Sequence, residues 1–598
     1  MNPPGQQKDK FTPELRIIVA SLLCMIIIFV WGKYFGPKPP APQPQASRPA
    51  QSAPATPGPA TSAPGTPGTA APTAATASQT APKTQATIAP AAPVNVAARS
   101  DSQERTITIE NNLYKVEISN RGAVVKSWQL KNYKDDAKPQ RVLDVVHPDA
   151  SQQTGGWPFA LVLDDEHLRD AANNGLYKVV SDGTSLRAPA DAEFAWSDGH
   201  LEVTKKFHFD HSYVVRAETS VQLDGKPIMA GLGWLGGFGD LTVTNPAPVE
   251  TISTYYSEGG KIASFPHKKL ESIDKWGAGV WQGGKDYAGI EDRYFTTAFL
   301  PPSGAAPGTL QTRYWKAWRN VQVNGQDTPE PVPQVAVATS AQPMALRVYV
   351  GPKDYDDLKK MNPPLHGLVN FGWLEFIADP LFHGLKWLHS YIPNWGWAIV
   401  VLTLIINMLL FPLRISSYKT TLKMQRVAPE IKAIQEKYKK YSMRDPRKAE
   451  MNKEVMAIYQ REGINPVGGC FQMFLQMPVW FGLNTALRYA IEMRHAPWLW
   501  IHDLSAKDPY YVLPVLMGLS MYLVSKMTPM TTTDPQQAAM MKIMPVSMAA
   551  IFMISPISSG LAVYILTSSV VGIAQQWYLN RKHPVPAAPA KPARGKKS

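Results

Sequence analysis

Cysteine is almost absent from this chain, because its 598 residues include only Cys24 and Cys470. Two separated cysteines exclude a disulfide framework, a zinc finger and a cysteine-ligated iron–sulfur cluster. The 12 histidines are dispersed, and no H-x-x-x-H or paired-carboxylate pattern occurs within the apolar runs. We therefore expect no cofactor, no bound metal and no catalytic residues.

Acidic residues are scarce where the chain is most basic. Lys and Arg outnumber Asp and Glu by 61 to 47, a net charge of +14. Residues 414–462 contain 13 basic and 6 acidic residues, and six basic residues with no acidic one follow Leu579. A basic excess confined to short segments indicates loops on the cytoplasmic side of a membrane. It does not indicate a nucleic-acid-binding globule.

Six apolar segments predict a polytopic α-helical membrane protein. No small-x-small cleavage site follows the first segment, so we expect an uncleaved anchor rather than a signal peptide. An even number of spans places both termini on one side, and the basic loops indicate that this side is the cytoplasm. The predicted segments are a cytoplasmic N-terminus at 1–16, an anchor at 17–35, spans at 395–413, 466–488, 511–525, 543–557 and 560–579, and a cytoplasmic tail at 580–598.

Two different segments follow the anchor. Residues 36–100 are rich in Pro, Ala and Thr, and 15 of the 54 prolines fall between Pro37 and Pro93, which predicts a flexible tether. In residues 101–352, apolar and polar residues alternate with period two, as in Thr106–Glu110, and Gly, Asp and Pro mark turns between the short alternating runs. This pattern predicts a large all-β antiparallel sandwich outside the cytoplasm.

Residues 379–392 predict an amphipathic helix, because Leu381, Leu385 and Leu388 recur at helical spacing after Asp379–Pro380. An ordinary surface helix would show the same spacing. The apolar run that follows at once favours a helix lying in the membrane interface.

Residues 414–464 predict a basic antiparallel helical hairpin on the cytoplasmic side. Apolar stripes step by four and three residues around Val427 and Ile431, and again around Val455 and Ile458. The alternative is a solvated hairpin that obeys the positive-inside rule and binds nothing. We expect ribosomal RNA to contact basic residues of the hairpin and the tail, namely Lys437, Lys439, Lys440, Lys591, Arg594, Lys596 and Lys597.

Polar side chains are frequent inside the predicted spans, and span 560–579 also carries Thr567, Ser568, Ser569, Gln575 and Gln576. Polar groups in hydrocarbon are costly unless they face one another or water. They predict a wet cavity inside the bundle. The alternative is interhelical hydrogen bonding, worth about 0.6 to 2 kcal/mol for each bond. The candidate groove and substrate contacts are Thr403, Asn407, Arg414, Gln472, Gln476, Asn484 and Thr485.

Six short segments form motifs that stand out in the C-terminal half of the sequence. They are Asn465–Cys470, Gln476–Pro478, Ala496–Pro497, Trp500–Tyr511, Leu513–Gly518 and Pro556–Leu561. These motifs resemble those of the YidC/Oxa/Alb family of membrane insertases. The resemblance is strong over residues 351–582 and looser in the β region, where Asp292–Phe295 matches best. Six spans and a large outer domain resemble the Gram-negative type, whose periplasmic domain is a β-supersandwich and whose core has five helices.

The resemblance implies a function without an enzymatic reaction. The family inserts and folds inner-membrane proteins, alone or with the Sec translocon, through a hydrophilic groove open to the cytoplasm and to lipid. No ATP site is needed, because burial of apolar segments drives the step. The implied partners are nascent membrane proteins, the Sec translocon, the ribosome, the signal-recognition-particle receptor and the phospholipid bilayer of the bacterial inner membrane.

This chain departs from the family pattern inside the groove. The family has an arginine where this sequence has Asn407, and two tyrosines where it has Asn484 and Thr485. Arg414 is the nearest cation on that helix face, about 10 Å closer to the cytoplasm by helical rise. We therefore expect an amide-rich groove that does not attract acidic substrate tails by a central arginine.

Two other functions are consistent with parts of the sequence. A transporter would also carry polar groups inside its spans, but no inverted repeat or pair of broken helices is present. An enzyme is the second alternative, because β-supersandwiches also occur in sugar-processing proteins. The region 105–350 offers no acid/base pair to support it.

Overall fold

The computed structural model describes residues 97–583 except for short gaps. The predicted anchor at 17–35, nearly all of the tether and the last fifteen residues of the tail lie outside the described residues, and the predicted span 543–557 is described only in part. The gaps are 182, 244–251, 271–279, 324, 370, 372–373, 442–444, 465–467, 529–542, 544–546, 549 and 555–556.

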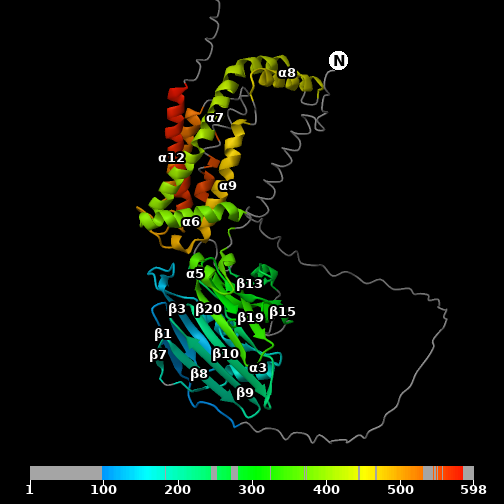
Figure 1. Cartoon of the computed structure of the whole chain (residues 1–598), viewed down its shortest axis with the longest axis vertical. Coiled ribbons are helices and arrows are strands. Elements are labelled where there is room, and N and C mark those ends of the chain that lie inside the picture. Colours follow the sequence, from blue (N-terminus) through cyan, green and yellow to red (C-terminus); the bar gives the residue numbers. More distant parts are fainter. Residues whose placement is uncertain are drawn as a thin grey trace, which may run out of the picture. The chain divides into compact units, whose positions relative to one another are not determined.

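The described residues between Thr106 and Pro352 form three β-sheets (Figure 1). Every strand pairing is antiparallel except that of β1 with β7. One five-stranded sheet has the order β4 (Val142–Asp144), β3 (Val124–Lys134), β2 (Tyr114–Ser119), β1 (Thr106–Glu110) and β7 (Ser185–Arg187). A second has the order β15 (Gln282–Lys285), β18 (Leu310–Val323), β19 (Gln326–Thr339), β12 (Gly231–Trp234) and β5 (Ala160–Val162).

The third sheet has ten strands and is the largest. Its β11 (Lys226–Pro227) pairs with β10 at the side of the main path. The path runs through β14 (Lys261–Pro266), β13 (Ser253–Glu258), β16 (Tyr287–Glu291), β17 (Phe295–Leu300), β20 (Met344–Pro352), β10 (Val214–Leu223), β9 (Leu201–Phe209), β8 (Ala190–Ser197) and β6 (Lys178–Val179).

Alternation of buried and exposed side chains explains why these segments form strands. In β9, the alternate residues Leu201, Val203, Lys205 and Phe207 are buried while Glu202, Thr204 and Lys206 are more exposed, because successive side chains point to opposite faces. Aromatic rings fill the core, as where Trp128 lies with its ring centroid 6.2 Å from that of Trp234. The β-rich domain predicted from the period-two pattern is confirmed.

The remainder is helical, also as predicted (Figure 1). Helix α6 (Glu375–Tyr391) contacts both α7 (Trp395–Lys437) and α9 (Gly468–Tyr489). The other helices of this part are α8 (Arg447–Arg461), α10 (Val512–Met527) and α12 (Ser559–Lys582), and short helices α2 (Pro148–Thr154), α3 (Glu166–Asn174) and α5 (Tyr355–Lys360) accompany the sheets.

Helix α6 begins four residues before the predicted start at Asp379, so Pro380 lies inside the helix. Proline lacks the amide hydrogen that would bond the carbonyl four residues earlier. That carbonyl belongs to Phe376, a residue that is 72% exposed, so the missing bond falls on a surface turn of the helix. Asp379–Pro380 therefore does not mark the helix start.

Helix α7 is long and apolar enough to cross a membrane, and α10 is a shorter apolar helix; both statements concern the described residues only. Helix α7 has 43 residues and continues past Pro412 and Pro429 into the predicted cytoplasmic region. Its later part packs on α8, where Val427 and Ile431 share a buried cluster with Ile458. The number of spans and the five-helix core stay predictions.

Candidate functional site

Polar side chains connect α7 and α12 along one line. The amide of Asn407 donates to its own helix at Thr403 O, 2.8 Å away, and to Ser568 Oγ on α12, 3.3 Å away. Gln575 donates from Nε2 to the backbone carbonyl of Asn407 at 3.2 Å. Asn407 and Thr403 are both buried, so these bonds satisfy groups that apolar surroundings would otherwise penalise.

Arg414 continues this line toward the end of α12. Its Nη1 donates to Gln575 Oε1 at 2.9 Å, and its Nη2 donates to the carbonyl of Gly572 at 3.3 Å. A β-carbon at Gly572 would lie 3.4 Å from Nη1, so glycine leaves room for the guanidinium against the helix backbone. Both acceptors are neutral, and among the described residues no carboxylate pairs with the Arg414 guanidinium.

Among its described side chains, helix α9 contributes one cross-helix bond to α12. Gln476 donates from Nε2 to the Tyr564 hydroxyl at 2.8 Å. Thr485 bonds within α9, to Phe481 O at 2.9 Å, and Asn484 is half-buried. The side chain of Gln472 lies outside the described residues.

A polar stripe on α12 brings these groups together. Tyr564, Ser568, Gly572 and Gln575 step by four, four and three residues, so they lie on one helix face. Asn407 and Arg414 reach this stripe from α7, and Gln476 reaches it from α9. The structure thus joins three of the predicted contacts through one helix. Sequence reasoning missed Tyr564 and Gly572, although the spacing of Ser568 and Gln575 pointed to that face.

A second polar cluster lies between the sheets and the segment that links α9 to α10. Arg494 Nη2 pairs with Asp240, and it lies 3.4 Å from Asp136 Oδ1. Lys386 on α6 pairs with Asp356 at 2.6 Å and with Glu492 at 3.0 Å. Burial raises the pKa of the Glu492 carboxyl, and the neighbouring Lys386 ammonium opposes this shift.

A polar cleft of about 470 Å³ adjoins this second cluster. Sequence reasoning missed both features, because Arg494 and Asp240 are 254 positions apart and neither carries a local motif. The cleft is lined by Asn132, Tyr133, Lys134, Gln140, Asp354, Ile491, Glu492, Arg494 and His495.

The predicted basic contacts divide into paired and exposed groups. Lys437 pairs with Glu454 at 2.9 Å, so part of its charge is balanced within the hairpin. Lys439 and Lys440 follow it and are exposed. The tail residues Lys591, Arg594, Lys596 and Lys597 lie outside the described residues.

Comparisons with known proteins identify the family. A family described as "YidC periplasmic domain" matches residues 106–384, and one described as "60Kd inner membrane protein" matches residues 387–586. A membrane protein insertase YidC of Citrifermentans bemidjiense is 34% identical over 80% of this chain and 86% of its own length. The chain belongs to the YidC family. A YidC insertase of Burkholderia multivorans is 33% identical over 86% of this chain and 88% of its own length.

A solved structure of an active YidC insertase, with its first transmembrane domain resolved, covers 80% of this chain and 94% of that chain at 17% identity and a TM-score of 0.34. The family models and the relatives that are at least 30% identical confirm the resemblance inferred from the sequence motifs at the level of the family. Members of the YidC family are membrane insertases and not enzymes, which sets aside the enzyme alternative.

Proposed function

We propose that this chain inserts and folds membrane proteins in the bacterial inner membrane, and that substrates pass along the polar stripe of α12. The observation that carries the proposal is the convergence of Asn407, Arg414 and Gln476 on that stripe from two other helices. Family membership supports it, because the relatives are named membrane protein insertases.

The stripe suits a hydrophilic segment that must enter the membrane. A peptide loses its hydrogen bonds to water in hydrocarbon, and each unsatisfied group costs several kcal/mol, on the order of the transfer cost of an amide. Amides and hydroxyls along α12 can replace part of those bonds. An apolar segment of the same substrate then leaves sideways into lipid, and its burial drives the step without a nucleotide.

The proposal includes a topology and partners. Both termini lie in the cytoplasm and the β domain lies in the periplasm, because the basic segments belong on the cytoplasmic side. The exposed Lys439 and Lys440, together with the basic tail, contact ribosomes that deliver nascent chains. The Sec translocon and the signal-recognition-particle receptor are the further partners that the family resemblance implies.

Depletion of the protein in cells tests the function. Newly made small membrane proteins should then remain protease-accessible in the cytoplasm, and plasmid-borne wild-type chain should restore their insertion. Unchanged insertion after full depletion would remove the proposal.

Cysteine labelling tests the path. With Cys24 and Cys470 replaced by serine, single cysteines at positions 407 and 476 should react with a water-soluble thiol reagent added from the cytoplasmic side. A cysteine at Leu404, an exposed apolar position of the same helix, serves as a lipid-facing control and should stay unreactive. Unreactive cysteines at 407 and 476 in a functional protein would mean that the polar groups only hold the helices together.

A further inference from the structure

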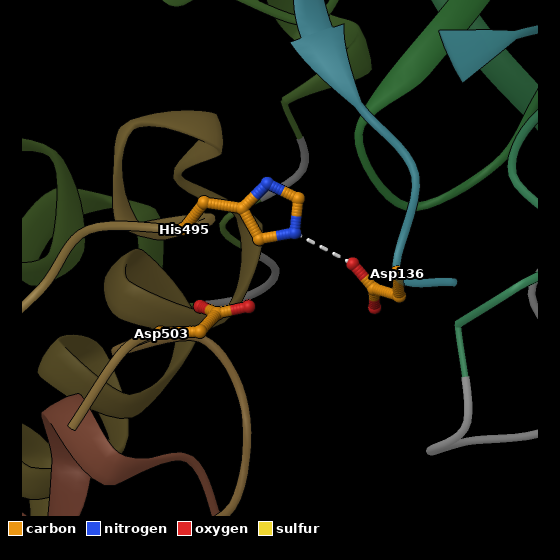
Figure 2. Close-up of side chains that lie close together, drawn as sticks. All are labelled: Asp136, His495 and Asp503. Atoms are coloured by element: carbon orange, nitrogen blue, oxygen red, sulfur yellow. Dashed lines mark hydrogen bonds and ion pairs between the residues drawn. The ribbon is translucent and has the colours of Figure 1, made fainter. Parts of the chain in front are cut away.

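Three metal-ligating side chains meet where the β domain contacts the segment between α9 and α10. Asp136 lies in the connection from β3 to β4, while His495 and Asp503 both lie between α9 and α10. Their ligand atoms, one from each residue, lie within 4.8 Å of one another (Figure 2). His495 Nε2 is 2.7 Å from Asp136 Oδ1. No local sequence motif predicts this group, because Asp136 and His495 are 359 positions apart in the chain.

The backbone holds His495 and Asp503 beside each other before any ligand arrives. Leu504 N donates to Ala496 O at 3.1 Å, and Trp498 and Ile501 exchange two backbone bonds of 2.8 Å. The segment therefore folds back on itself, with residues 495 and 503 on adjacent legs. His495 has a φ of +56°, a conformation in which histidine is enriched over most other residue types. Preorganised ligands lower the entropy cost of binding an ion.

The charges around the group favour a cation. The carboxylates of Asp136 and Asp503 both lie beside the His495 imidazole (Figure 2), and the carboxylate of buried Asp240 is connected to Asp136 through Arg494. Arg494 pairs mainly with Asp240 and reaches Asp136 only at 3.4 Å. Among the described residues no lysine or arginine forms an ion pair with Asp503. Three carboxylates against one guanidinium leave an excess negative charge that a divalent ion would balance.

We propose that Asp136, His495 and Asp503 form a zinc site that ties the β domain to the α9–α10 segment. One imidazole nitrogen and two carboxylate oxygens, with water as the fourth ligand, suit tetrahedral Zn²⁺ better than Ca²⁺ or Mg²⁺, which prefer oxygen alone. Ligand atoms around tetrahedral zinc lie about 3.3 Å apart, from bond lengths of about 2.0 to 2.1 Å. On zinc binding, the distance between His495 Nε2 and Asp136 Oδ1 would lengthen slightly, and the Asp503 carboxylate would move toward these two atoms.

The adjoining cleft gives the site an entry path and water. His495 lines that cleft, whose volume is about 470 Å³, and all three ligands are only half-buried. Zinc binding would exchange one hydrogen bond between the two segments for three metal bonds. The ion would thereby strengthen the contact of the Asp136 loop with the α9–α10 segment.

The test measures zinc on the tag-free full-length chain in lipid nanodiscs. After chelation, the protein is dialysed against micromolar zinc chloride and the bound metal is counted by mass spectrometry. We expect one zinc per chain, and binding about tenfold or more weaker in H495Q and in D503N. Glutamine at 495 can still donate to Asp136, so the fold of the segment is kept. Cobalt substitution should give the visible absorption bands of a four-coordinate site.

H208Q is the matched control. His208 pairs with Asp191 at 2.6 Å on neighbouring strands, and this pair belongs to no three-ligand group among the described residues. Its replacement should leave zinc binding unchanged. A variant could lose zinc simply because it misfolds, so a second measurement uses the wild-type chain alone. Zinc should block carbethoxylation of His495, as measured by peptide mass spectrometry.

The outcomes are distinct. Absence of zinc from the wild-type chain, or full reactivity of His495 in its presence, would overturn the proposal. Zinc that binds equally well to H495Q and D503N would place the ion elsewhere and would overturn it too. Loss of zinc in both variants with retention in H208Q would support it.

Discussion

Replacing Asn407 by leucine distinguishes a hydrated substrate path from simple helix adhesion. The variant removes the cross-helix contact between Asn407 and Ser568, in which the Asn407 amide donates to Ser568 Oγ at 3.3 Å and the Ser568 hydroxyl donates to Asn407 Oδ1 at 3.4 Å. The bond from Gln575 survives, because it ends on the backbone carbonyl of residue 407. A hydrogen bond between membrane helices averages about 0.6 kcal/mol, and leucine favours the apolar phase by about 0.5 kcal/mol. The two effects nearly cancel, so stability should change by less than about 1 kcal/mol.

Insertion should nevertheless fall several-fold in Asn407→Leu, because the stripe loses its central amide and with it bound water. The assay is protease mapping of a newly made small membrane protein in depleted cells, with thermal unfolding of the purified variant measured in parallel. Ser568→Ala removes the same cross-helix contact but leaves the amide in place, so it should insert nearly as well as wild type. Asn407→Arg should also be tolerated, because the family accommodates arginine there.

The hydrated-path hypothesis would be refuted if Asn407→Leu and Ser568→Ala impaired insertion equally and if, in both variants, the loss of insertion followed the loss of thermal stability. The polar groups of α7 and α12 would then be adhesive contacts, and the substrate path would lie elsewhere.

Four further predictions follow from named contacts. Arg414→Ala should slow substrates with acidic translocated tails more than neutral ones, measured by the same protease mapping. Burial lowers the pKa of His147 to about 4 from 6.5, so the unfolded chain binds more protons between these values. Stability should therefore be complete above pH 6.5 and should fall by about 3 kcal/mol toward pH 4 in thermal unfolding, and His147→Gln should flatten that profile. Arg494→Met should cost about 3 to 5 kcal/mol of unfolding free energy, because it leaves the Asp240 carboxylate buried and unpaired. A chain that lacks residues 110–340 should still complement depleted cells. This deletion removes Asp240 and the β domain around it, so no buried carboxylate is left unpaired and Arg494 becomes exposed to water.

Local patterns sufficed for the elements of this fold. Period-two alternation predicted the β-rich domain, since one face of each strand meets the core, as Leu201 and Val203 do in β9. The apolar stripes around Val427 and Ile458 likewise predicted where α7 and α8 pack together. The misplaced start of α6 shows the limit, because an exposed second turn tolerates a proline that sequence rules treat as a boundary.

Contacts between distant segments could not be predicted from sequence. Gly396 shows why: a β-carbon there would lie 2.2 Å from Cδ1 of Trp498, an approach that no local pattern encodes. The pairing of Arg494 with Asp240 has the same character, since it depends on how the β domain meets the α9–α10 segment. By contrast, the polar face of α12 was open to prediction, because helical spacing alone aligns Tyr564 with Ser568.

In the proposed path, Arg414 supplies the cation that position 407 lacks, and its partners leave that cation available to a substrate. The guanidinium is held by two neutral acceptors, Gln575 Oε1 and the carbonyl of Gly572. A carboxylate adds opposite charge and can accept two parallel N–H···O bonds from a guanidinium, which the neutral glutamine oxygen cannot do, so a substrate carboxylate can displace that oxygen. Arg414 lies about 10 Å along α7 from Asn407, from seven residues of helical rise. In the proposed path the positive charge therefore meets an acidic segment at the entrance, where water lowers its cost, and the amides of the stripe take over farther inside.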